Sequence, residues 1–102
     1  MDRIALLKEV LAADPANVLA RYGLAMEFSK AGETDAAMAE FKRLIADNPN
    51  YVAAYQQGAQ TLLNAERNDE ARELLNQGIA IAERDGNSHA KSEMEGMLDS
   101  IF

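Results

Sequence analysis

The sequence has no cysteine, only two prolines and a single histidine. The lack of cysteine excludes disulfides, thiolate chemistry and zinc sites built from cysteine. Residues 1–15 mix charged with apolar side chains and contain no continuous apolar segment followed by a cleavage site, so we expect no secretory signal. No apolar run approaches the length that crosses a bilayer. These absences predict a cytoplasmic protein with no membrane partner.

An excess of positive charge is also lacking. The chain carries 10 basic and 17 acidic residues and a net charge of −7. No basic stripe is available to neutralise phosphates, so nucleic acid is excluded as a partner. We interpret the acidity as a solvated surface, and a mild preference for basic partners is the alternative.

Residues that favour β-strands are sparse, whereas alanine, leucine and glutamate are frequent. This balance predicts an all-α fold. A length of 102 residues, of which 48% are hydrophobic, fits one folded domain over residues 1–102.

The chain repeats itself. "DPANVLARYGLA" at residues 14–25 matches "NPNYVAAYQQGA" at residues 48–59, and Pro15 and Pro49 lie 34 residues apart (49 − 15 = 34). Small residues match small ones and large apolar residues match large ones at the same offset. The pairs are Val18/Val52, Ala20/Ala54, Ala25/Ala59, Phe28/Leu62, Ala31/Ala65, Asp35/Asp69, Ala37/Ala71, Phe41/Leu75 and Ile45/Ile79.

Each repeat contains the pattern of two helices. Gly32 suits the left-handed position after the first helix, and Thr34 is expected to cap the next one, with Asp35 in its first turn. In the second repeat Asn68 is the expected cap and Gly86 the expected stop. Apolar residues at helical spacing form the inward faces. They are Leu24, Ala25 and Phe28; Ala37, Phe41, Leu44 and Ile45; Tyr55, Ala59 and Leu62; and Ala71, Leu74, Leu75 and Ile79.

This pattern resembles the tetratricopeptide repeat, whose 34-residue signature is W-x2-L-G-x2-Y, then A-x3-F, then P. The resemblance implies a short right-handed α-solenoid of antiparallel helix pairs with six helices. We expect two full repeats, at 18–51 and 52–85. They are flanked by a leading helix at 2–13 and a capping helix at 88–101.

The second repeat departs from the family pattern in ways that predict looser packing. Gly58 stands where leucine is expected, and Gly78 stands where the first repeat has Leu44. Glu83 replaces the closing proline, so we expect the last helix of this repeat to continue to about Asp85. A missing core side chain costs a few kcal/mol when its space stays empty.

In the resembling family, the first helices of successive repeats line a concave groove, which implies a partner-binding site here. One set of expected groove residues is Leu19, Tyr22, Met26, Ser29 and Lys30. The other is Ala53, Gln56, Gln60, Leu63 and Asn64. Apolar anchors at one end and amides at the other suit an extended peptide. The alternative is that Tyr22 and Met26 pack against helix 2–13 and contact no ligand. The groove lacks the Lys, Asn and Arg residues with which some family members clamp a carboxylate.

Catalytic constellations are absent. His89 has no companion histidine or cysteine, and the chain contains no phosphate-binding glycine loop and no metal-ligand cluster. We therefore expect a non-enzymatic protein without cofactor or metal. It would act as an adaptor or scaffold that binds a peptide segment or helix of another protein. The alternative is an assembly subunit that forms homo- or hetero-oligomers, including weak homo-oligomers, through Leu98, Ile101 and Phe102.

Overall fold

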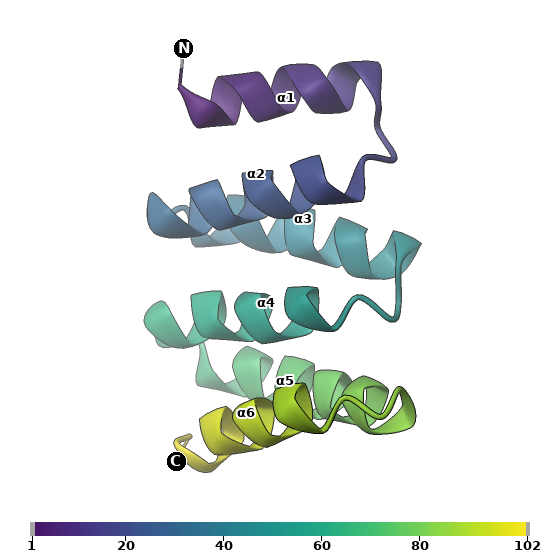
Figure 1. Cartoon of the computed structure of the whole chain (residues 1–102). Helices are drawn as coiled ribbons and strands as arrows, with labels where there is room; N and C mark the ends of the chain where they lie inside the picture. Colours follow the sequence, from purple (N-terminus) through teal and green to yellow (C-terminus); the bar gives the residue numbers. More distant parts are fainter. Residues whose placement is uncertain (1, 102) are drawn as a thin grey trace.

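A computed structural model of the chain describes residues 2–101, and Figure 1 shows its helices stacked in one layered column. Over these residues there are six helices and no strand, so the predicted all-α class and the number of helices are confirmed. The helices are α1 (Arg3–Ala13), α2 (Val18–Lys30), α3 (Thr34–Asp47), α4 (Val52–Asn64), α5 (Asn68–Arg84) and α6 (Ser88–Asp99).

Consecutive helices run antiparallel, with α2, α4 and α6 on one side of the column and α3 and α5 behind them (Figure 1). On the first side, α2 contacts α4 and α4 contacts α6. On the other side, the backbones of α3 and α5 stay apart in the described part of the chain, although Arg67 Nη1 at the start of α5 reaches Asp35 Oδ1 of α3 at 2.6 Å. The column is therefore tighter along α2, α4 and α6, and we call the surface of these three helices the inner face.

Side-chain caps fix the starts of three helices. Asp2 accepts a hydrogen bond from the backbone N–H of Ala5 at 2.8 Å, and Asn17 accepts one from Ala20 at 2.9 Å. Asn87 does the same for α6. Each bond satisfies an N–H that the first helical turn leaves without a partner.

The α2–α3, α4–α5 and α5–α6 turns each contain one residue in the left-handed conformation. Gly32 and Gly86 have φ of +76° and +72°, which confirms them as helix stops, and Glu66 takes the corresponding position after α4 with φ of +60°. The N–H of Glu33 reaches back to the carbonyl of Phe28 at 2.9 Å, which closes a Schellman turn. The α4–α5 and α5–α6 turns contain the equivalent bond, at 2.9 and 2.8 Å.

In the α2–α3 and α4–α5 turns, the caps expected from the sequence lie one residue past the N-cap position. Glu33 and Arg67 occupy the N-cap positions without a side-chain capping bond, while Thr34 and Asn68 are the first helical residues. The prediction that Thr34 and Asn68 are caps is therefore wrong. The residue directly after the left-handed one is the N-cap, so each helix starts one residue earlier than the sequence predicted.

Small residues lie where the helices approach most closely. Five of the alanines repeated at the 34-residue offset are completely buried: Ala25, Ala37, Ala54, Ala59 and Ala71. Ala31 and Ala65, which belong to the turns, are exposed. Phe41, Leu44, Leu75 and Met94 are the largest fully buried side chains and fill the spaces between them. This alternation of short and bulky side chains gives close packing between helices.

The expected looser packing of the second repeat is wrong at its two glycines. A Cβ atom at Gly58 would lie 2.9 Å from Leu74 Cδ2. One at Gly78 would lie 2.7 Å from both Met94 Sδ and Tyr55 Cβ. Neighbouring side chains have thus moved into the space that leucine would fill. The predicted extension of the last helix is confirmed, since α5 ends at Arg84 with Asp85 as its C-cap.

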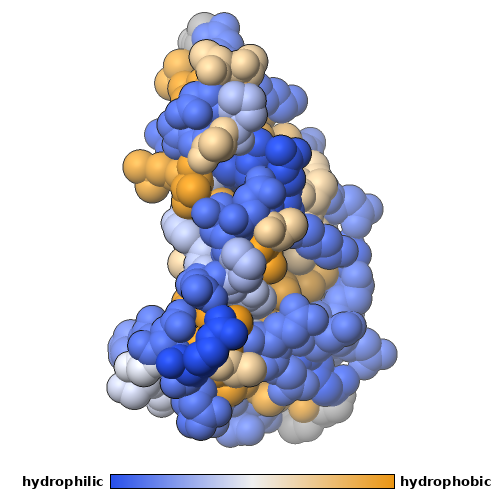
Figure 2. Space-filling model, turned by 90° about the vertical axis from the view of Figure 1, so that its right-hand side faces the viewer, coloured by the Kyte–Doolittle hydropathy of each residue, from blue (hydrophilic) through white to orange (hydrophobic). Residues whose placement is uncertain are grey.

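Figure 2 looks onto the side of the column where the α1–α2, α3–α4 and α5–α6 connections lie. Hydrophilic residues cover most of this surface, and hydrophobic ones form small, separate patches (Figure 2). Three large hydrophobic side chains are exposed in the described residues: Leu6 (50%), Val10 (37%) and Leu19 (77%). All three belong to α1 and α2, so exposed apolar surface gathers at the N-terminal end.

Candidate functional site

An open hollow of about 780 Å3 lies between α1 and α2. Four of the residues expected in the groove meet here, because they share one stripe of α2: Leu19, Tyr22, Met26 and Lys30. The opposite wall comes from α1, through Arg3, Leu7 and Val10. The sequence reasoning missed this wall. Val10 on this wall is exposed, whereas the neighbouring Leu11 is buried.

Leu19 and Val10 give the hollow exposed apolar surface. Leu19 is 77% exposed although it lies beside the buried Ala20 on the same helix. An exposed leucine alone is ordinary on a protein surface, but a hollow with several apolar walls is typical of a binding site.

Tyr22 belongs both to the hollow and to the core. Its ring meets Phe41 edge-on at 6.3 Å between centroids and lies tilted against Tyr51 at 5.6 Å. Burial, with a smaller contribution from Tyr51, raises the pKa of Tyr22 above its ordinary value. Met26 packs against the same core cluster, and both side chains keep partial exposure.

Helix α1 packs over Gly23 of α2 and not over Tyr22. Leu7 of α1 lies 3.5 Å from the position that a Cβ atom would take at Gly23. Gly23 therefore lets α1 approach α2, while Tyr22 and Met26 are placed against the core that α2 shares with α3 and α4. Both stay among the residues that line the hollow.

The rim of the hollow carries a cluster of charges. Arg3 Nε donates to Glu27 Oε1 at 2.6 Å, and Lys30 Nζ lies 3.4 Å from Glu27 Oε2. The Glu27 side chain is mostly covered, at 13% exposed, while those of Arg3 and Lys30 are 71% and 74% exposed. Two accessible cations share one covered carboxylate, so this rim is net positive in a chain whose overall charge is −7.

Ser29 is not among the residues that line the hollow. Its hydroxyl lies 2.8 Å from that of Thr61, and the Thr61 hydroxyl also lies 2.8 Å from the carbonyl oxygen of Gln57, to which it donates. This bond joins α2 to α4 across the two repeats. The hydroxyl of Ser29 is thereby used in contact between helices.

The α4 residues expected in the groove form a separate polar stripe. Gln60 Nε2 donates to Asn64 Oδ1 at 2.9 Å, and Gln56 Nε2 donates to Glu93 Oε1 at 3.4 Å. Ala53 is exposed beside them, whereas Leu63 is half-buried against the core. The amide-rich end exists, but its side chains are already hydrogen-bonded within the chain and do not line the hollow.

The C-terminal residues named for oligomer contact pack against their own chain. Leu98 and Ile101 are half-buried and lie on the cluster around Met94, and Ile101 also touches the cluster around Phe41. Phe102 lies outside the described residues.

His89 is the single histidine of the chain and lies on the surface of α6. His89 Nε2 lies 3.3 Å from Glu93 Oε1, with the imidazole 86% exposed on α6. No group of three or more His, Asp or Glu side chains in that range is placed to hold a metal ion. None of the helices there is both long and apolar enough to cross a membrane.

Stacked helical hairpins with an open hollow at the leading helices define a helical-repeat protein. The family model described as tetratricopeptide repeat matches residues 4–57 and 28–92. A TPR repeat-containing protein of Pseudomonas aeruginosa is 30% identical over 95 residues, which cover 93% of this chain and 90% of that one. The chain therefore belongs to the tetratricopeptide repeat family.

Solved structures agree with this assignment. The solution structure of a tetratricopeptide repeat domain protein from Salinibacter ruber matches with a TM-score of 0.75 and 30% identity, over 83% of this chain and 86% of that one. A solution structure of a protein from Bordetella parapertussis has the same fold, with a TM-score of 0.84 and 23% identity over 97% and 86% of the two chains. Members of this family are generally non-enzymatic modules for protein–protein interaction.

Proposed function

We propose that the chain is an adaptor or scaffold that binds a peptide segment or helix of a partner protein on its inner face. The observation that supports this most is the hollow between α1 and α2, where Leu19, Val10 and Met26 present apolar surface around about 780 Å3. Such a space accepts apolar side chains of a partner and excludes water from them.

The charges of the rim narrow the chemistry of the partner. Arg3 and Lys30 favour an acidic residue next to the apolar one, since each has exposed donors and only Glu27 to share. Farther along the inner face, Gln60 and Asn64 offer amide donors and acceptors to an extended backbone. An unstructured peptide loses conformational entropy on docking, so modest affinity is expected.

Leu19→Glu tests the proposal, because Leu19 is 77% exposed and contributes little to the core. Peptides selected by the wild-type chain from a random display library should lose at least about tenfold in affinity, which corresponds to ~1.4 kcal/mol. Leu6→Glu is the matched control, since Leu6 is 50% exposed on α1 but does not line the hollow. The proposal fails if the selected peptides bind Leu19→Glu as tightly as wild type, or if only Leu6→Glu weakens them.

An assembly role is the second candidate, and the exposed Leu6 and Val10 at the free end of the column favour it. The residues first considered for this role, Leu98 and Ile101, already pack on their own chain. Sedimentation of the full chain and of Leu6→Glu separates the two roles. A concentration-dependent dimer that Leu6→Glu dissociates supports assembly, whereas a monomer in both samples rejects self-association.

A further inference from the structure

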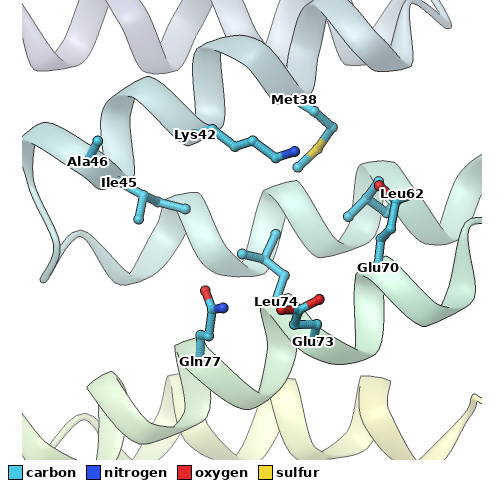
Figure 3. A pocket seen from close by; sticks show the side chains of 9 residues that line it. All are labelled: Met38, Lys42, Ile45, Ala46, Leu62, Glu70, Glu73, Leu74 and Gln77. Carbon is cyan, nitrogen blue, oxygen red and sulfur yellow. The ribbon is translucent and has the colours of Figure 1, made fainter.

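A second cavity opens on the side of the molecule away from the inner face. It has a volume of about 330 Å3 and lies between α3 and α5, with Leu62 of α4 among its lining residues (Figure 3). The cavity follows from the curvature of the column, because the backbones of α3 and α5 stay apart. We call it the outer pocket. Met38, Ile45, Leu62 and Leu74 give it apolar walls, and the remaining lining residues are Lys42, Ala46, Glu70, Glu73 and Gln77.

Charged side chains stand on opposite sides of the outer pocket. Figure 3 shows Lys42 extending from α3, with Glu70 and Glu73 on α5 across from it. Glu70 is already matched, because Arg67 Nε and Nη2 donate to its two oxygens at 2.5 and 2.9 Å. These bonds, with a further contribution from the positive charge of Lys42, lower the pKa of Glu70.

Glu73 is the carboxylate of the outer pocket that has no charged partner among the described residues. Within residues 2–101 it makes no ion pair and accepts no side-chain hydrogen bond. It is exposed at an apolar pocket in a chain with a net charge of −7. A negative charge beside an apolar cavity complements a ligand that carries an apolar group next to a cation.

We propose that the outer pocket binds an apolar side chain of a partner polypeptide whose neighbouring lysine or arginine contacts Glu73. A cavity of about 330 Å3 has room for one leucine or phenylalanine side chain and lies near the lower end of the usual range for ligand sites, roughly 300–1,000 Å3. This site is independent of the hollow between α1 and α2, so a partner could occupy both faces of the column.

Three capped dipeptides test the proposal: acetyl-Phe-Lys-amide, acetyl-Phe-Gln-amide and acetyl-Phe-Glu-amide. They share the apolar group and differ in the charge of the second side chain, and the glutamine and glutamate peptides are nearly the same size. Titration of the full chain is followed by the methyl resonances of its methionines, since Met38 lines the outer pocket while Met26 lines the other hollow. The Met38 signal should shift saturably, and the lysine peptide should bind about two- to fivefold more tightly than the glutamine peptide, as expected for an exposed ion pair.

Two substitutions and a control separate the charge from the cavity. Glu73→Gln should remove the preference for lysine but keep the binding of the glutamine peptide. Ala46→Phe, at an exposed residue of the pocket wall, should fill the space and abolish binding of all three peptides while the circular dichroism spectrum stays that of wild type. Glu95→Gln, at an exposed carboxylate on α6, should change nothing.

Four outcomes overturn the proposal. One is the absence of any saturable Met38 shift up to about 20 mM peptide, which would place affinity below the range of specific recognition. Another is a shift confined to Met26. The third is preference for the glutamate peptide, which would make Lys42 the residue that selects the ligand. The last is an unchanged preference for lysine in Glu73→Gln.

Discussion

Gly78→Ala should destabilise the protein, although the same substitution usually stabilises a helix. Gly78 lies inside α5 and is buried against α4 and α6. An added Cβ atom would lie 2.7 Å from Tyr55 Cβ and 2.7 Å from Met94 Sδ. Real Cβ contacts are not this short, so the neighbours must move. Tyr55 Cβ is fixed to the backbone of α4, and Met94 is completely buried and has little freedom to turn away.

Two opposing effects set the magnitude. Replacing glycine by alanine inside a helix gains about 1 kcal/mol from reduced conformational freedom of the unfolded chain. Forcing an extra methyl group into a filled core costs about 1–3 kcal/mol. Because one of the two clashing atoms cannot move without its helix, we expect the upper part of that cost. The net loss is then about 1–2 kcal/mol in the free energy of unfolding, or a fall in Tm of about 4–10 °C for a domain of this size.

Gly96→Ala is the matched control. Gly96 is also inside a helix, but no atom lies within 4 Å of the position that a Cβ atom would take there. Only the helical gain applies at this residue, so stability should rise by roughly 0.5–1 kcal/mol. Gly58→Ala should fall between the two, since its closest neighbour, at 2.9 Å, is the mobile end of Leu74.

Urea and thermal unfolding followed by circular dichroism measure the three variants under the same conditions. The order of stability should be Gly96→Ala above wild type, and Gly78→Ala below it. If Gly78→Ala is as stable as Gly96→Ala, then α4 and α6 do not approach α5 as closely as described. The explanation of how this repeat replaces leucine by glycine would then be wrong.

Three further predictions concern charged and titrating groups. Arg21→Met should lower the free energy of unfolding by about 1–2 kcal/mol in urea, because it leaves the half-buried Glu40, now 2.6 Å from Arg21 Nη1, without its partner; no loss would show the pair to be neutral. The raised pKa of Tyr22 contributes stability that is complete below pH 10.0 and is lost as pH rises through the raised value, so Tyr22→Phe should flatten alkaline unfolding curves. The lowered pKa of Glu70 contributes stability above pH 4.5 that is lost as pH falls through the lowered value, so Arg67→Met should reduce the dependence of Tm on acid pH, and an unchanged profile would contradict the ion pair.

The fold could be predicted from the sequence because the same pattern of small and large apolar residues occurs in it twice. Alanines such as Ala25 and Ala59 recur at an offset of 34 residues where helices touch, and both are completely buried. Helical spacing then orients each helix without any knowledge of its neighbours. Positive φ at Gly32 was predictable for the same local reason.

What the sequence left open depends on contacts between helices and on the geometry of the turns. The looser packing expected from Gly58 did not occur, because Leu74 comes from another helix and moves into the space. The cap expected at Thr34 failed because the residue directly after the left-handed Gly32 is already the N-cap, and that residue is Glu33. Local patterns cannot report how far a distant side chain moves or how tightly a turn closes.

The candidate site was likewise predicted in part and missed in part. The stripe of Leu19 and Tyr22 on α2 was predicted from helical spacing together with the resemblance to the repeat family, and both residues line the hollow. The wall formed by Val10 was missed, since spacing within α1 does not say how far that helix stands from α2. The outer pocket is invisible in the sequence, because it arises from the separation of α3 and α5.

The position of α4 has a consequence for the order in which the helices unfold. In the described residues α4 touches every other helix except α1, whereas α1 touches α2 alone. Helix α1 can therefore detach while the other helices stay folded. Unfolding of α4 removes the packing of α2, α3, α5 and α6 at the same time. Amide hydrogen exchange should accordingly be fastest in α1 and slowest in α4, so one wall of the hollow opens and closes on its own while the opposite end of the chain behaves as a single cooperative block.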